Sequence, residues 1–293
     1  MAKLISDASV AELQRHPRFE AAVAASMRGS IELHQSGRLS NWILNDRARA
    51  WFGHALLYLH ATARPGDPQS GLTPARIKDL AVEAGICSAG RAAAMLSLMR
   101  AAGYLERAPV TTDRRVRRLA PTAKLLEVQR QRLRRQFAAI AIVLPEAQQA
   151  LASLGLPDFE KALALAIGEE FMSGTRLLSH SPDLKPFAEY SAGMVVLFGL
   201  MLATEQQGSF AIGGPLAVSI SELARRFRVS RTQVLRLLRE AEEGGFLART
   251  GTNYESVVLC PKLKRDMLNM FAALYLFLAG AAAEATAATR AAA

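Results

Sequence analysis

Residues 220–247 read ISELARRFRVSRTQVLRLLREAEEGGFL. Two helical patterns meet in it at a short turn. Ser219 precedes the first pattern and is followed three residues later by Glu222, while Ser230 and Gln233 open the second in the same way. Both pairs have the spacing of a capping box, in which each residue satisfies a free backbone N–H of the other. The stretch therefore predicts a helix–turn–helix.

The second helix of this pair has an apolar face and a polar face. At about 3.6 residues per turn, the apolar stripe consists of Val234, Leu237, Leu238 and Ala241. Gly244-Gly245 then ends the helix. Guanidinium groups on the opposite face suit the major groove of DNA, although a solvated surface helix has the same pattern. This helix contributes six candidate DNA-binding residues: Ser230, Arg231, Thr232, Gln233, Arg236 and Arg239.

Length and composition favour two mainly helical domains with an anionic partner. The chain has 293 residues, of which 51% are hydrophobic and only 6% aromatic, and alanine and leucine dominate. The net charge is +10 and the sequence pI about 10.1, which indicates an acidic partner such as nucleic acid. Residues 1–145 carry 22 Lys and Arg against 11 Asp and Glu, whereas the remainder carries 14 against 15. The net positive charge of the chain therefore comes from its first half.

Cysteine usage and hydropathy favour a cytoplasmic protein. Cys87 and Cys260 are far apart and lack a metal-ligand spacing, which suits a reducing compartment without disulfides. Met1–Val10 lacks the apolar core of a signal peptide. The longest apolar run, Met270–Ala283, has 14 residues, fewer than the roughly 20 that a membrane span requires. We therefore expect a buried helix there and no membrane partner.

The sequence carries no recognisable catalytic or metal-binding pattern. The histidines have no metal-ligand spacing, and they are His16, His34, His54, His60 and His180. A phosphate-binding glycine loop and a nucleophile elbow are also missing from the sequence. We therefore expect a protein that is not an enzyme and that uses no cofactor or metal.

Residues in the second half repeat those of the first at a nearly constant offset. The repeated sets keep their order along the chain, and the offset of 140 to 143 residues changes only in expected turns. The first members of the pairs are Pro17, Phe19, Glu20, Ala22, Ala24, Ile77, Leu80, Ala81, Ser88, Leu96, Gly103, Leu105, Arg107, Leu119, Pro121 and Lys124. The pattern predicts a duplication joined near Leu144-Pro145, with repeats at residues 1–143 and 144–293.

Both halves are expected to contain the same order of elements. In the first half we predict helices within 10–34, 39–63, 73–84 and 88–103, strands over 104–107 and 116–120 around a hairpin tip at 111–115, and a long helix over 121–143. In the second half we predict helices over 159–178 and 187–204, the helix–turn–helix, a strand–turn–strand over 246–259 and a final helix over 261–288. The predicted fold is mainly α with short β-wings.

This order of elements resembles that of the MarR family of winged-helix transcription regulators. The most specific similarity is in the first repeat, where Asp113-Arg114-Arg115 and Leu119-Ala120-Pro121-Thr122 are similar to the family's wing and to the start of its closing helix. Members of that family act as homodimers whose terminal helices form a platform for two winged lobes. The resemblance and the duplication imply a monomeric pseudo-dimer, in which two winged helix-turn-helix repeats share a helical platform with pseudo-twofold symmetry.

The two repeats differ at the residues expected to face DNA. The exposed positions of the reading helix in repeat 2 align in repeat 1 with Gly90, Ala94 and Ser97, which cannot hold guanine with a bidentate fork. The charge of repeat 1 lies in its expected wing, for which a solvated hairpin is the alternative. Repeat 1 contributes the candidates Ser88, Arg91, Arg114, Arg115, Arg117 and Arg118. Its closing helix adds four arginines that fit a solvated face as well as DNA contact: Arg130, Arg132, Arg134 and Arg135.

The sequence therefore indicates a cytoplasmic, DNA-binding transcription regulator that acts on double-stranded DNA. The family resemblance implies repression by blocking a promoter, and it implies a small-molecule effector, for which the sequence identifies no pocket. Two other classes fit the same features. A plasmid-type replication initiator also carries two winged helices in one chain, and a protein-interaction scaffold would keep the fold without binding DNA.

Overall fold

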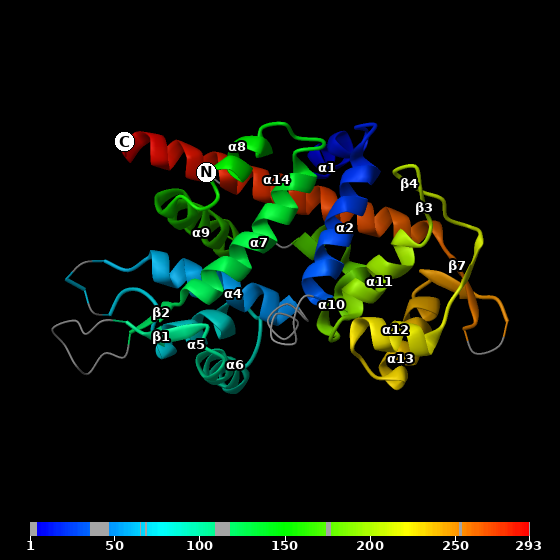
Figure 1. Cartoon of the computed structure of the whole chain (residues 1–293), viewed down its shortest axis with the longest axis horizontal. Helices are drawn as coiled ribbons and strands as arrows, with labels where there is room; N and C mark the ends of the chain where they lie inside the picture. Colours follow the sequence, from blue (N-terminus) through cyan, green and yellow to red (C-terminus); the bar gives the residue numbers. More distant parts are fainter. Residues whose placement is uncertain are drawn as a thin grey trace.

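The computed structural model describes residues 5–35, 47–64, 66–67, 69–108, 118–173, 177–251 and 254–292, and the fold is mainly helical with small antiparallel sheets (Figure 1). The first half contains α1 (Asp7–Gln14), α2 (Phe19–Gln35), α4 (Arg47–Ala61), α5 (Pro74–Glu83), α6 (Ala89–Ala101), β1 (Leu105–Arg107), β2 (Leu119–Pro121) and α7 (Ala123–Ile140). The second half contains α8 (Ala147–Ser153), α9 (Pro157–Met172), η1 (Leu177–His180), η2 (Pro182–Leu184), α10 (Lys185–Glu189), α11 (Gly193–Leu202), β3 (Glu205–Gln206), β4 (Ser209–Phe210), β5 (Pro215–Ala217), α12 (Ile220–Phe227), α13 (Arg231–Glu243), β6 (Leu247–Arg249), β7 (Ser256–Leu259) and α14 (Pro261–Ala292).

The described strands form three small sheets. β1 pairs with β2 and β3 with β4, each as an antiparallel pair, and the third sheet has the order β5-β7-β6. In that sheet Leu247 lies opposite Leu259, and Leu216 lies opposite Val257. The sequence did not predict β3, β4 or β5, because strands of two or three residues carry no measurable alternation of apolar and polar side chains.

Two lobes lie at opposite ends of the molecule and use the same turns. We define the first lobe as α5, α6, β1 and β2, and the second lobe as β5, α12, α13, β6 and β7. After the first helix of each lobe, Gly85 (φ 64°) and Arg228 (φ 54°) take a left-handed conformation, and Gly103 (φ 72°) and Gly245 (φ 71°) do so after the second. At each turn the next backbone N–H bonds a carbonyl oxygen five residues earlier, at 2.8–3.0 Å. Residues 142 or 143 positions apart therefore share their backbone conformation.

Two predicted helices of the second half end early. The helix expected over 159–178 ends at Met172, and the one expected over 187–204 is broken into α10 and α11. The break lies at Ala192, which is left-handed with φ 59°. A Cβ at Gly193 would lie 2.2 Å from the carbonyl oxygen of Phe187, so the chain can fold back on α10 only because this residue is glycine.

The first half differs from the prediction at its closing helix. Pro121 ends β2, and Thr122 takes the N-cap position, so α7 begins at Ala123 and ends at Ile140. The predicted hairpin tip at 111–115 lies outside the described residues. So do residues 116–117 of the predicted strand and 39–46 of the predicted helix.

The two halves are interlocked by their first helices. α1 and α2 pack on α14 and α11 of the second half, while α8 and α9 pack on α7 and α4 of the first, so the exchange is reciprocal. Gln14 of α1 donates to Asn269 of α14 at 2.8 Å. The buried hydroxyl groups of Ser26 on α2 and Tyr275 on α14 are hydrogen-bonded at 2.8 Å. The packing around these helices is therefore shared between the two halves.

An acidic residue of each exchanged helix pairs with the closing helix of the other half. Glu20 of α2 accepts from Nζ of Lys264 at 2.8 Å, and Glu160 of α9 accepts from Nε of Arg130 at 2.6 Å. Glu20 also accepts the backbone N–H of Phe210 at 2.7 Å. Burial alone would raise the pKa of Glu20, but the hydrogen bonds from Lys264 and Phe210 outweigh burial and lower its pKa. These two acidic residues are 140 positions apart, the offset found in the sequence.

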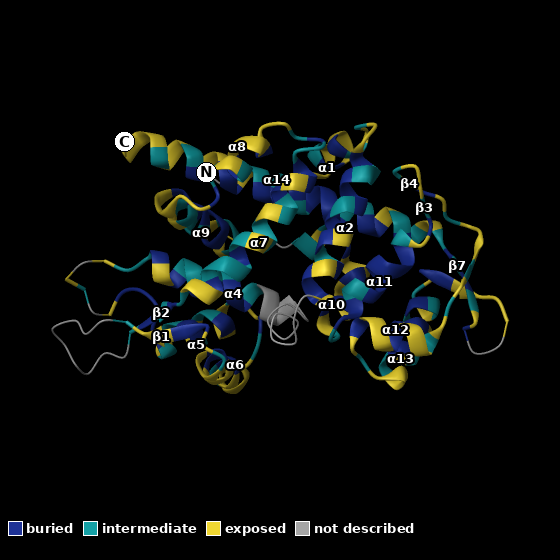
Figure 2. Ribbon diagram, viewed as in Figure 1, coloured by how far each residue is buried: buried dark blue, intermediate teal, exposed yellow. Residues whose placement is uncertain are grey.

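One large hydrophobic core spans both halves, and a smaller core supports the first lobe. The large core includes Phe19, Phe159 and Phe271, and the small core includes Phe52 and Ile77. Figure 2 shows buried residues along α2, α11 and α14. Among the described helices, α14 alone is long and apolar enough, by length and composition, to cross a membrane, and 56% of its most apolar window is buried inside the protein.

The left-handed turns generate a prediction about stability. Gly85→Ala is expected to destabilise the chain by about 1–2 kcal/mol, because a Cβ disfavours positive φ. Gly90→Ala is the matched control, since Gly90 lies within α6 with open space around an added Cβ, and it is expected to stabilise by about 0.5–1 kcal/mol. Urea unfolding measures both changes. Equal effects of the two substitutions would contradict the assigned turn.

Candidate nucleic-acid interface

Serine caps begin both helices of the second lobe, as the sequence predicted. Oγ of Ser219 accepts the backbone N–H of Glu222 at 3.2 Å, and Oγ of Ser230 accepts that of Gln233 at 3.1 Å. Neither predicted capping box is complete, because the structure shows no bond from the side-chain oxygen of Glu222 or Gln233 back to the N–H of its cap serine. The Nε2 of Gln233 donates to the backbone oxygen of Ser191. The first turn of α13 is therefore tied to the segment between α10 and α11.

The two faces of α13 are those predicted from its sequence. All four members of the apolar stripe are buried: Val234, Leu237, Leu238 and Ala241. Ser230 and four residues of the polar side are exposed, namely Arg231, Thr232, Arg236 and Arg239. Figure 1 shows α13 and α6 at the same edge of the molecule, on the side away from α14. One extended surface could therefore meet both lobes.

Arg236 is exposed but held in place by two neighbours. Its Nη2 donates to the hydroxyl group of Tyr190 at 2.8 Å, and its Nε donates to Glu240 at 3.0 Å. The guanidinium carbon lies 4.8 Å from the centre of the Tyr190 ring. The hydrogen bond to Glu240, followed by the charges of Tyr190 and Glu240, raises the pKa of Arg236. A bidentate contact with a base would require Arg236 to leave at least one of these partners.

Arg231 and Arg239 are the less constrained arginines of α13. Both are exposed, and within the described part of the chain neither makes a hydrogen bond or an ion pair. A small pocket next to α13 is lined by Tyr190, Ser230, Thr232, Gln233, Arg236 and Leu237. The exposed surface of α13 thus combines the positioned guanidinium of Arg236 with two that can reorient.

The hairpin of β6 and β7 carries an exposed basic residue that is not among the candidate DNA-binding residues predicted from the sequence. Arg249 at the end of β6 is exposed, and its guanidinium carbon lies 5.0 Å from the centre of the Tyr254 ring. Tyr254 donates to Glu242 of α13 at 2.6 Å, so the hairpin is attached to the second helix. Arg249 aligns with Arg107 at the offset of 142 residues, and this match between the repeats could have identified Arg249 as a candidate residue.

The first lobe presents a small, weakly charged face at the corresponding place. Gly90, Ala94 and Ser97 are all exposed on α6. Ser88 caps the helix by accepting the backbone N–H of Arg91 at 3.3 Å, and both residues are exposed. Within this lobe, α6 offers one arginine side chain near its start and no large polar group on the face that corresponds to Arg236 and Arg239.

Three of the four arginines predicted for the first wing lie outside the described residues, namely Arg114, Arg115 and Arg117. Arg118 is half-buried, and its Nη2 donates to the backbone oxygen of Asp67 at 2.6 Å. The Nε of Arg118 is buried and has no hydrogen-bond partner among the described atoms. Arg118 therefore connects the base of the hairpin to the preceding loop. Contact with DNA would compete with that bond.

The arginines of α7 serve different purposes. Arg130 forms the ion pair with Glu160 described above, and Arg135 lies 3.7 Å from Glu32 of α2. Arg132 faces an internal cavity between the two halves, whereas Arg134 is exposed. The sequence left two interpretations open for these four arginines, a solvated helix face and contact with DNA. A solvated face fits Arg134 alone. The burial of Arg132 could not be predicted, because the wall opposite it comes from the second half.

Comparison with protein-family models, curated proteins and solved structures finds no match for this chain. Within the described part of the chain, no group of three or more histidine, cysteine, aspartate and glutamate side chains could hold a metal ion.

Proposed function

We propose that this chain is a DNA-binding transcription regulator with a winged helix-turn-helix in each of the repeats 1–143 and 144–293. The observation that carries the proposal is the exposed arginine face of α13, the second helix of a serine-capped pair. A helix of this kind can enter the major groove, where arginine reads guanine. The order α12, α13, β6 and β7, with β5 completing the sheet, supports a winged lobe.

The reciprocal exchange of first helices supports a pseudo-dimer within one chain. A homodimer holds two lobes at a set distance through an interface between two copies. Here the pairs α1–α14, α2–α11, α4–α9 and α7–α8 form the equivalent contacts inside one molecule. We infer that one chain occupies one DNA site, in the cytoplasm, and that it represses transcription by covering a promoter.

The first lobe supports a second candidate role. Val82 on α5 is 50% exposed and Leu98 on α6 is 40% exposed, and they are two of four large hydrophobic residues with exposed side chains in the described part of the chain. Leu98 directly follows Ser97 on α6, and α5 packs on α6. The alternative is that this lobe contacts a protein, while the second lobe alone reads DNA, as in a scaffold that has kept one DNA-binding lobe.

Salt dependence is the first test of the proposed function. If the arginines of both lobes make about six phosphate contacts, the logarithm of the binding constant falls with the logarithm of salt concentration with a slope of roughly −5. Fluorescence anisotropy with duplex DNA at several salt concentrations measures this slope. A slope near zero would exclude DNA as the main ligand, and a slope near −2 would favour the one-lobe alternative.

Selection from random DNA is the second test, because the two lobes present different residues. We expect a non-palindromic site with base discrimination in one half-site, since Arg236 and Arg239 of α13 correspond on α6 to Ala94 and Ser97, which cannot hold guanine with a bidentate fork. Arg239→Ala and Arg236→Ala are each expected to relax discrimination there by about 1–3 kcal/mol per lost bidentate contact.

Arg134→Ala is the matched control for this selection, because Arg134 is exposed on α7, outside both lobes. It should leave the selected motif unchanged. A symmetric motif selected by the wild-type protein would contradict the proposal that base discrimination lies in the second lobe. The proposal would also be contradicted if Arg236→Ala and Arg239→Ala each selected the same motif as the wild type.

A further inference from the structure

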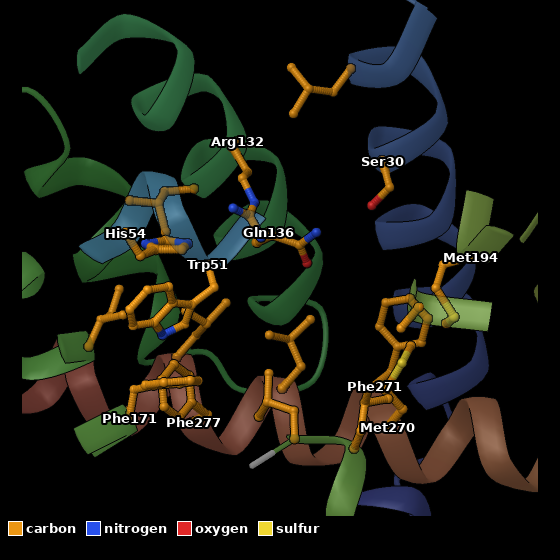
Figure 3. A pocket seen from close by; sticks show the side chains of 18 of the residues that line it. Ser30, Trp51, His54, Arg132, Gln136, Phe171, Met194, Met270, Phe271 and Phe277 are labelled. Atoms are coloured by element: carbon orange, nitrogen blue, oxygen red, sulfur yellow. The ribbon is translucent and has the colours of Figure 1, made fainter. Parts of the chain in front are cut away.

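The first lobe exposes apolar side chains on its outer surface. Val82 near the end of α5 and Leu98 on α6 are exposed, and Figure 2 shows further exposed residues along α6. The apolar side chains of Trp51 and Phe271, by contrast, line a cavity between the two halves (Figure 3). A second macromolecule can therefore reach Val82 and Leu98 without displacing any part of this chain.

The corresponding surface of the second lobe carries charged and polar side chains instead. At the repeat offsets of 142 and 143 residues, each exposed residue of the first lobe is smaller or more apolar than its counterpart. The pairs are Val82 and Arg225, Gly90 and Thr232, Ala94 and Arg236, Ser97 and Arg239, Leu98 and Glu240, and Ala101 and Glu243. An exposed surface with apolar and small side chains in place of charged ones indicates contact with another protein.

The exposed face of α6 is complementary in shape to a second copy of itself. Gly90, Ala94, Leu98 and Ala101 recur every three or four residues, so they share one face of the helix. In an antiparallel pair with a two-fold axis at Ala94, Leu98 of one copy lies opposite Gly90 of the other, because both residues are four positions from the axis. A Cβ added at Gly90 would meet no atom within 4 Å, so the space opposite Leu98 is open. The largest side chain of this face therefore meets the smallest.

The charges beside this face are complementary in the same arrangement. Glu83 ends α5 just before the start of α6, and Arg100 lies in the last turn of α6. Both side chains are exposed, and neither forms an ion pair with a described residue of its own chain. In an antiparallel pair the start of one α6 lies beside the last turn of the other, which brings Glu83 of each copy toward Arg100 of the other. A parallel pair would bring like charges together, so the charges favour the antiparallel orientation.

We propose that the apolar face of the first lobe, made of Val82, Gly90, Ala94, Leu98 and Ala101, binds a second copy of this chain through an antiparallel pair of α6 helices. A contact limited to two helices and the turns before them belongs with the small, transient interfaces, which bury less than about 1,200 Å². The chain is therefore in equilibrium between monomer and dimer. In the dimer the second lobes lie at the two far ends, because the lobes of each chain lie at its opposite ends (Figure 1).

Self-association competes with DNA binding, and this consequence, unlike the self-association itself, rests on the proposed function. Because α6 and α13 lie at the same edge of the molecule, a duplex that meets both lobes covers α6 (Figure 1). A second copy bound to α6 blocks that contact. DNA and the second copy must then lower each other's affinity by the same factor. The dimer therefore holds part of the protein in a form that cannot place both lobes on DNA.

Sedimentation equilibrium of the full chain, without DNA, tests the self-association. The average mass is expected to rise with concentration from 31.7 kDa toward twice that value. Leu98→Glu should weaken the association at least tenfold, and glutamate suits this position because the second lobe carries Glu240 there. The matched control is Leu156→Glu, at an exposed leucine outside both lobes, which should leave the association unchanged. A monomer at every concentration would overturn the proposal, as would equal effects of the two substitutions.

An exchange of charges covers the case in which Leu98→Glu does not fold. Glu83→Arg and Arg100→Glu should each weaken the association at least threefold, because each brings like charges together, and the double variant should restore it. The second lobe carries the exchanged residues at the aligned positions, Arg226 and Glu242. A double variant that associates as weakly as the single variants would overturn the antiparallel arrangement.

Cross-linking at the two-fold axis tests the register. In a chain with Cys87→Ser and Cys260→Ser, Ala94→Cys places one thiol beside that of the second copy, since helix axes in contact lie about 8–10 Å apart. A short bismaleimide is expected to join two chains. The matched control is Ala138→Cys, at an exposed alanine of α7, which should remain unlinked. Equal yields of linked dimer from the two variants would overturn the assigned interface.

The competition has its own measurement, so its failure is distinguishable from failure of the interface. The cross-linked dimer of Ala94→Cys is expected to bind duplex DNA at least threefold more weakly per chain than the same protein before cross-linking. If the protein self-associates but does not bind DNA, the proposed function fails and the interface stands. If the linked and unlinked proteins bind DNA equally, α6 does not contact DNA and the competition is wrong.

Discussion

The structure depends on the reciprocal exchange of the first helices between the two halves. On α2, Phe19, Val23 and Met27 are at most 1% exposed, and they lie in the core that both halves share. Burying one such side chain contributes about 1.5–3 kcal/mol, so three contribute roughly as much as the whole stability of a small domain, about 5–15 kcal/mol. The buried hydroxyl pair of Ser26 and Tyr275 then sets the register of α2 on α14.

This exchange explains why the lobes can diverge without loss of the common framework. The main contacts between the halves are made by α1, α2, α4, α7, α8, α9, α11 and α14, and the exposed faces of α6 and α13 take no part in them. The second lobe has kept exposed arginines, whereas α6 carries small residues. The same framework encloses a cavity with walls from both halves.

Local features of the sequence predicted local features of the structure. The serine caps at Ser219 and Ser230, the buried stripe of α13 and the order of helices within each lobe follow from spacing and periodicity alone. The break at Ala192 could not be predicted, because it depends on the contact of Gly193 with the backbone of Phe187. The positions of Arg118 and Arg130 could not be predicted either, because each bonds a residue at least 30 positions away in the sequence, Asp67 and Glu160 respectively. The winged-helix assignment and the DNA-binding residues remain predictions.

A cross-linking experiment tests the exchange most directly. Gln14→Cys and Asn269→Cys, in a chain with Cys87→Ser and Cys260→Ser, place two thiols where α1 meets α14. A short bismaleimide is expected to join them within one chain, giving a cross-linked monomer at every dilution. A control pair, Gln14→Cys with Ser97→Cys, should not react, because α1 and α6 lie at opposite edges of the molecule (Figure 1). Cross-links that form only between chains, and disappear on dilution, would contradict the account.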